Sequence, residues 1–294
     1  MKIFLLYVLL LAAIISQRAF ACSSCGSGAL DPIILFPNEN QKFYLGLSHQ
    51  SRIRDISSNG EVRPTSGLAT RKAASFSVAK RIFQTKTFLS FTGSFIENAS
   101  HENSARGFLD PLITIRYDLI RHNFTRPYVP MVQLIGSRKM ALGRSLHESK
   151  DAQLLDIYST GYDETSLGID VWFGGLPIGF GASYFYSYTH KDTKDGIAID
   201  PGDRTTLITT LGYTYKNRLK VVGGAICSHS YKMSLDEKFI SNSQKTYHSY
   251  YAGLETLSIK PLNYRITMSE RSASRAKNGT SFTSVTFAIM RGFL

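Results

Sequence analysis

Twelve segments with alternating apolar and polar side chains run along this chain, and the connections between them alternate in length. Connections after the odd-numbered segments hold about 9 to 26 residues, and those after the even-numbered segments about 2 to 7. An even number of strands with short turns at one end and long loops at the other is typical of membrane β-barrels. The expected segments are 42–53, 71–83, 87–97, 108–120, 128–137, 164–173, 178–190, 205–216, 219–231, 248–258, 263–271 and 281–293.

The segment "FLDPLITIRYDLI" shows the alternation most clearly. Its apolar series is Ile113, Ile115, Tyr117 and Leu119, and its other series is Leu112, Thr114, Arg116 and Asp118. A period of two is the strand period, and about ten tilted residues are enough to cross a bilayer. The sequence therefore predicts an all-β fold over residues 42–294. We expect a single antiparallel transmembrane β-barrel of about 12 strands, with short periplasmic turns and long external loops.

The N-terminus has the pattern of a secretory signal peptide. Lys2 precedes a short apolar run, and Ala19 and Ala21 supply an Ala-x-Ala cleavage site. We expect residues 1–21 to be removed and residues 22–41 to form a periplasmic Cys/Gly-rich segment. The formal net charge is +12, and loss of Lys2 and Arg18 with the signal leaves +10.

The basic charge and the predicted export limit the partners that we expect. A basic exported protein suits anionic partners, and nucleic acid is not expected among them. The expected partners are outer-membrane lipid, lipopolysaccharide and an unidentified small solute. The alternating C-terminal segment "FTSVTFAIMRGFL" also predicts recognition by the barrel assembly machinery. The predicted location is the cell outer membrane, with the N-terminus in the periplasm.

Two stretches carry a family resemblance. In "GFLDPLITIRYDL", Gly107, Asp110, Arg116 and Tyr117 match a motif of the outer-membrane barrels grouped as the MetA pathway of phenol degradation family. The stretch "CSSCGSGALDP" is similar to the segment that follows the signal peptide in many members. The resemblance implies an outer-membrane barrel and passage of a solute, and it names no substrate.

Cys22 and Cys25 are three residues apart at the expected mature N-terminus. They could form a small local disulfide, bind a soft metal such as Cu(I), or carry a lipid on Cys22. Haem attachment is excluded because Gly26 follows the second cysteine where a histidine is needed. We expect the disulfide, and we expect neither a cofactor nor a dedicated metal site.

Charged and amide side chains occupy the strand face opposite the apolar one. We expect them to line the lumen, with Glu255 pairing with Arg265 on the neighbouring strand. They could select solutes, with the basic residues favouring anions, or they could brace the wall through ion pairs. The candidates are Arg116, Asp118, Gln133, Asp170, Glu255, Arg265 and Arg271. The function that we expect is a passive channel for a small solute, selected by pore width and lumenal charge. A sealed structural or adhesion barrel is an alternative.

One enzymatic constellation is present in "LSHQSRIRDISSNG". His49 and Ser51 share a strand face near the predicted external end of the first strand, and Asp55 or Asn59 could orient the histidine. Such a pair resembles outer-membrane phospholipase A and the lipid A deacylases, in which a histidine activates a serine. Arg52 follows Ser51 where those families have Asn-Gly. A lipid acyl hydrolase is therefore a second alternative, and we expect that the protein is not an enzyme.

Overall fold

The computed structural model describes residues 39–57, 59, 61–64, 68–82, 85–121, 129–145, 148–151, 153–173, 177–194, 196–215, 219–241, 243–256, 262–271 and 279–293. The predicted signal peptide (1–21), most of the predicted periplasmic segment (22–41), and Cys22 and Cys25 lie outside these residues. Their predicted roles therefore stay predictions.

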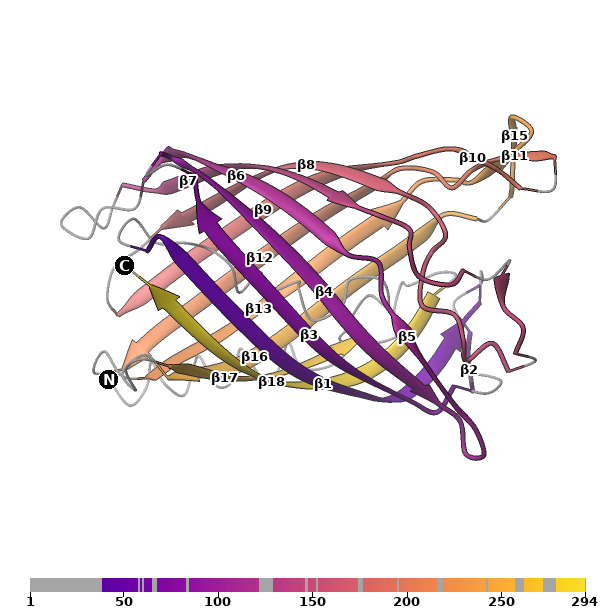
Figure 1. Cartoon of the computed structure of the whole chain (residues 1–294), viewed down its shortest axis with the longest axis horizontal. Coiled ribbons are helices and arrows are strands. Elements are labelled where there is room, and N and C mark those ends of the chain that lie inside the picture. Colours follow the sequence, from indigo (N-terminus) through magenta and orange to yellow (C-terminus); the bar gives the residue numbers. More distant parts are fainter. Residues whose placement is uncertain are drawn as a thin grey trace.

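Twelve long strands form one closed antiparallel barrel (Figure 1). Each strand pairs with the next long strand along the chain, and pairing of the last strand with the first closes the ring. The predicted all-β, twelve-stranded fold is confirmed. The long strands are β1 (Gln41–Ile56), β3 (Thr70–Arg81), β4 (Thr87–Ala99), β6 (Leu112–Ile120), β7 (Met131–Lys139), β8 (Glu164–Phe173), β9 (Ile178–Thr189), β12 (Arg204–Tyr215), β13 (Leu219–Ser230), β16 (Lys245–Thr256), β17 (Asn263–Arg271) and β18 (Gly279–Phe293).

Six short strands extend the connections. β2 (Val62–Pro64) pairs with β1, and β5 (Ser104–Phe108) pairs with β4. The other four form a separate small sheet: β10 (Asp192–Lys194), β11 (Ile197–Asp200), β14 (Ser234–Leu235) and β15 (Lys238–Phe239).

The predicted segment 108–120 is divided in the structure. Phe108 belongs to β5, and β6 begins at Leu112, after Pro111. Proline has no backbone N–H to donate to a sheet, so the regular pairing stops there and restarts beyond it. The prediction was wrong for the first residues of this segment and right for the remainder.

The two ends of the barrel differ. We call the end where Gln41 pairs with Phe293 the terminal end, and the opposite end, which carries the small sheet, the loop end (Figure 1). The predicted alternation of connection lengths is confirmed, since each connection at the loop end is longer than the connections before and after it, but the two ranges of length overlap. The connection 121–130 at the terminal end is longer than 272–278 at the loop end, because β7 begins later and β18 earlier than predicted.

The outer face of the barrel is apolar and the inner face is polar. On β6 the exposed outward residues include Ile113, Ile115 and Tyr117, whereas Arg116 and Asp118 are buried, as predicted. Other strands expose large apolar side chains in the same way: Leu45, Leu47, Phe76, Leu89, Leu134, Leu207, Leu211, Leu254 and Ile266. So extensive an apolar surface is unusual on a soluble monomer and matches the lipid-facing band of a membrane barrel. The described residues include no helix able to span a membrane.

Candidate solute pathway on the inner wall

A network of buried charges covers the inner wall from β3 to β8. The Asp118 carboxylate lies 3.0 Å from Arg81 Nη1 and accepts a hydrogen bond of 2.7 Å from Gln133 Nε2. Arg116 Nη1 donates to Gln133 Oε1 at 3.2 Å and lies 3.6 Å from Asp170. All four charged side chains are only 3% exposed. Two arginines therefore face two aspartates on the strands, and these four formal charges cancel. A third arginine, the partly exposed Arg121 just past the end of β6, lies 3.6 Å from Asp118.

The network continues onto β9 through Asp170. One carboxylate oxygen accepts a hydrogen bond from Trp172 Nε1 at 3.0 Å, and the other accepts one from Ser183 Oγ at 2.6 Å. Asp170 therefore holds both Arg116 and the Trp172 indole in place.

A second group of charges lies on β13, β16, β17 and β1. Arg265 donates to Glu255 Oε2 from Nε at 3.2 Å and from Nη2 at 2.6 Å, so the predicted ion pair is present. Lys220 interacts electrostatically with Glu255, Arg265 and Lys42. Lys42 in turn pairs with Glu39 at 3.2 Å. Three basic residues and two acidic ones leave this group with one net positive charge.

Trp172 and Lys220 connect the two groups. Lys220 Nζ lies 5.6 Å from the centre of the Trp172 ring, although β9 and β12 separate their strands. Glycines make this approach possible. A Cβ on Gly181 would be 2.8 Å from the indole, and a Cβ on Gly212 would be 3.1 Å from Lys220 Cε. We call the side chains of these two groups and their connection the inner belt: Glu39, Lys42, Arg81, Arg116, Asp118, Gln133, Asp170, Trp172, Lys220, Glu255 and Arg265.

Other large inward side chains also lie over glycines. A Cβ on Gly46 would be 2.3 Å from the Tyr44 hydroxyl, and one on Gly224 would be 2.5 Å from the Tyr251 hydroxyl. These aromatic side chains therefore lie along the wall.

Arg271, a predicted lumen residue, lies apart from the inner belt near the loop end. Its guanidinium is 4.0 Å from the centre of the Tyr247 ring and donates to the Thr280 carbonyl at 2.9 Å. Only 1% of the residue is exposed. The structure thus brings six of the seven predicted lumen residues into one belt and places Arg271 elsewhere.

Sequence reasoning missed Arg81, Lys42, Trp172 and Lys220. Each is on the inward series of its strand, so strand parity could have identified it as lining the lumen. Parity gives no information on which residues of different strands lie at the same height, and this height decides membership of the belt.

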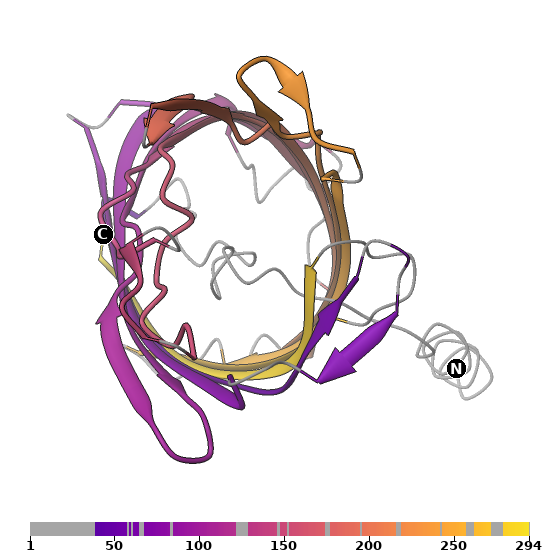
Figure 2. The same ribbon diagram turned by 90° about the vertical axis from the view of Figure 1, so that its right-hand side faces the viewer.

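The long connection 140–163 folds into the mouth at the loop end. Asn98, an inward residue of β4 that is 1% exposed, donates from Nδ2 to the Leu155 carbonyl at 2.6 Å and to the Ile157 carbonyl at 3.2 Å. Leu155 is also 1% exposed. Figure 2 looks into the loop end and shows the connection inside the ring of strands, along one side. The connection therefore narrows the entrance on that side.

Charged groups stabilise the fold of this connection. Burial raises the pKa of Asp156, but hydrogen bonds from Ser149, the Lys150 amide and Arg144 outweigh burial and lower the pKa to about 2. The Asp163 pKa is also lowered, by the Ala141 amide and Arg138. Both carboxylates are therefore ionised at neutral pH, and both hold backbone amides of the connection.

The proposed hydrolase residues do not form a catalytic arrangement. His49 is exposed on the outer face beside Leu47, and a β-bulge lies between Ser51 and Arg54. Within the described ranges, no hydrogen bond joins His49 to Ser51, Asp55 or Asn59. The Asn59 side chain instead accepts hydrogen bonds from Ser57 and from the Glu61 amide in the following turn.

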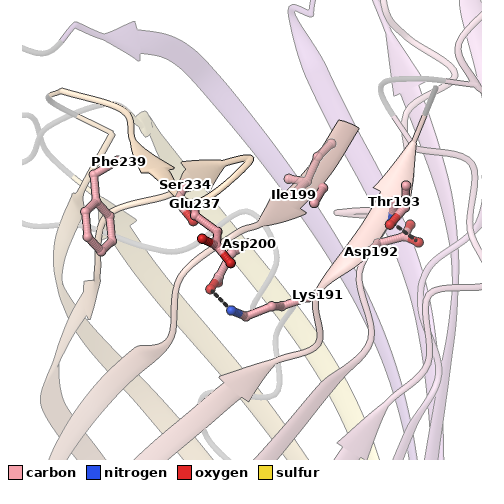
Figure 3. A pocket seen from close by; sticks show the side chains of 9 residues that line it. Lys191, Asp192, Thr193, Ile199, Asp200, Ser234, Glu237 and Phe239 are labelled. Carbon is pink, nitrogen blue, oxygen red and sulfur yellow. Dashed lines mark hydrogen bonds and ion pairs between the residues drawn. The ribbon is translucent and has the colours of Figure 1, made fainter. Parts of the chain in front are cut away.

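A shallow pocket lies in the small sheet at the loop end (Figure 3). Lys191 pairs with Asp200 at 3.1 Å on one side, and the exposed Phe239 ring lies on the other. Glu237 is at the tight β14–β15 turn and has a positive φ of 65°. Among the residues that the model describes, no group of three or more His, Cys, Asp or Glu side chains could hold a metal ion.

Comparisons with known proteins identify the fold. No family model and no curated protein sequence matches this chain. Among solved structures, the COG4313 outer membrane channel from Pseudomonas putida F1 aligns with a TM-score of 0.71 and 9% identity, over 88% of this chain and 97% of that chain. The NanC porin aligns with a TM-score of 0.53 and 8% identity, over 86% and 100%. At such low identity the likeness shows a shared barrel fold, and the family resemblance drawn from Gly107 and Asp110 stays a prediction.

Proposed function

We propose that this protein is an outer-membrane channel through which small solutes pass by passive diffusion. The observation that carries the proposal is the inner wall: a closed barrel whose lumen is lined by fixed charges and by large side chains lying flat on glycines. Selection then depends on the width of the lumen and on its charge. Barrels that share this fold include proteins described as an outer membrane channel and a porin.

The charge of the lumen favours anions in this proposal. On the described strands, inward basic residues outnumber inward acidic ones. The basic set is Lys42, Arg71, Arg81, Arg116, Lys139, Arg204, Lys220, Arg265 and Arg271, and the acidic set is Asp118, Glu164, Asp170 and Glu255. A confined lumen of one sign concentrates counter-ions and excludes co-ions.

The proposed orientation places the terminal end in the periplasm. Short turns face the periplasm and long loops face outward in barrels of this type. A protease-cleavable tag inserted in 100–103 should be cut on intact cells, whereas a tag in 82–86 should be cut only after the outer membrane is permeabilised. The reverse result would overturn the orientation.

Single-channel conductance tests the channel itself. Folded protein is inserted into a planar bilayer, and the reversal potential is read under a KCl gradient. Steady conductance with a preference for chloride is expected. A folded protein that conducts no ions would contradict the proposal and favour a sealed structural barrel.

A further inference from the structure

Trp172 and Lys220 present an aromatic face and a cation side by side in the lumen near the terminal end. Trp172 is the next-to-last residue of β8, and Lys220 is the second residue of β13. The chain contains no other tryptophan.

The indole is fixed in position on the inner wall. One side lies on the wall, where a Cβ on Gly181 would be 2.8 to 3.0 Å from three ring atoms. The Nε1–H is anchored by Asp170 at 3.0 Å. The residue is partly exposed. A ring held flat on the wall in this way loses little entropy when a second ring stacks on it. Lys220 Nζ lies over the ring, 5.6 Å from its centre, so a ligand ring would stack on the part of the indole that the ammonium leaves uncovered.

The Lys220 ammonium shares its nearest carboxylate, Glu255, with Arg265. Within the described residues, no acidic group lies within ion-pair distance of it. Glu255, the nearest acid on the neighbouring strand, already accepts two hydrogen bonds from Arg265. Lys42 and Arg265 add positive charge nearby. This corner of the lumen therefore lacks one negative charge close to Nζ.

We propose that Trp172 and Lys220 form a binding subsite for small aromatic carboxylates, with the ring stacked on the indole and the carboxylate paired with Lys220. The proposal rests on the proposed channel function and names the class of solute that the channel retains. The 5.6 Å between Nζ and the indole centre is within cation–π range.

Trp172 fluorescence tests the subsite directly, since the chain has a single tryptophan. The folded full-length protein in detergent is titrated with benzoate, acetate, benzyl alcohol and benzylammonium. We expect saturable quenching by benzoate. Its affinity should be about tenfold higher than that of benzyl alcohol, because the carboxylate adds a partly desolvated contact with the Lys220 ammonium. Acetate and benzylammonium should give no saturable change. Equal quenching by benzoate and benzylammonium would overturn the proposal.

Two variants assign the effect to the named residues. Lys220→Met should reduce benzoate affinity to that of benzyl alcohol, whereas Lys191→Met, in an exposed loop ion pair, should leave it unchanged. Trp172→Phe has no tryptophan signal, so benzoate binding is read as block of chloride current, which should weaken. Benzoate affinity that survives Lys220→Met would contradict the proposal.

The same preparation separates this inference from the proposed function. Conductance in KCl without benzoate-specific quenching would remove the subsite and leave the channel. Absence of conductance from folded protein would contradict the channel, whatever the fluorescence shows.

Discussion

Replacement of Glu255 by glutamine should strengthen the anion preference of the lumen. In the inner belt, Arg81 and Arg116 balance Asp118 and Asp170, so the net charge comes from the group around Glu255. That group carries one net positive charge, and Glu255→Gln doubles it. The amide keeps the size of the side chain and can still accept from Arg265.

The magnitude follows from the distance of a passing ion. An ion about 6 Å from the carboxylate in water interacts with it by about 0.7 kcal/mol, and screening at about 0.1 M salt roughly halves this. Loss of this screened interaction changes the local concentration of each ion about twofold, upward for chloride and downward for potassium. The ratio of anion to cation permeability should therefore rise about fourfold.

The reversal potential in a tenfold KCl gradient measures this ratio. Glu102→Gln is the matched control, because Glu102 is exposed at the loop between β4 and β5 and should have no effect. The double variant Glu255→Gln with Arg265→Gln restores the original net charge and should return the ratio to the wild-type value. An unchanged ratio in folded Glu255→Gln, or a shift toward cations, would refute this account of selectivity.

Three further changes test other parts of the structure. Gly181→Ala places a Cβ 2.8 Å from the Trp172 ring, so the indole should lift from the wall. The variant should then show lower conductance and stronger quenching of Trp172 fluorescence by iodide. Gly179→Ala, where the closest contact would be 3.6 Å, is the control and should behave as wild type. Asp156→Asn should let trypsin cut the 140–163 connection at Arg144 or Lys150 while the barrel stays intact, and Glu237→Gln should not; equal cutting of both variants would contradict the role of Asp156. Because the Asp156 pKa is lowered to about 2, the carboxylate stabilises the connection fully above the ordinary carboxyl pKa of 3.8 and loses this effect as the pH falls toward 2. Hydrogen exchange of the backbone amides in the connection should therefore become faster in acid. Ser51→Ala should leave any measured ester hydrolysis unchanged, and a loss would restore the hydrolase alternative.

The strands could be predicted because one face of each strand in a membrane barrel contacts lipid and the other face lines the lumen. Every second residue of a strand meets lipid, so β6 had to expose Ile113 and Ile115 and bury Arg116. The break at Pro111 was missed because the apolar alternation continues through it, whereas the lost backbone donor interrupts only the pairing. Local pattern therefore located the strands and their faces, and backbone chemistry decided where each one starts.

The inner belt was only partly predictable. Glu255 and Arg265 lie on strands that follow one another, so a short turn brings them together and sequence reasoning found the pair. Trp172 and Lys220 lie on strands separated by two others, and their contact needs the tilt of the barrel and glycines at two positions between them. Neither the tilt nor the height of a residue along the axis is encoded in alternation, which explains why the pair was missed.

The position of these glycines links the sequence to selectivity. Gly181 and Gly212 have no side chains, so Trp172 and Lys220 can reach each other across the two strands between them. Their contact joins the part of the wall whose strand charges balance to the basic part. In the proposed channel, a solute crossing the belt would meet cancelled strand charges on one side and net positive charge on the other. An anion would be drawn toward the β13–β17 side, where Lys220 and Arg265 lie. We therefore expect selection to depend on which wall the solute follows as much as on the width of the lumen.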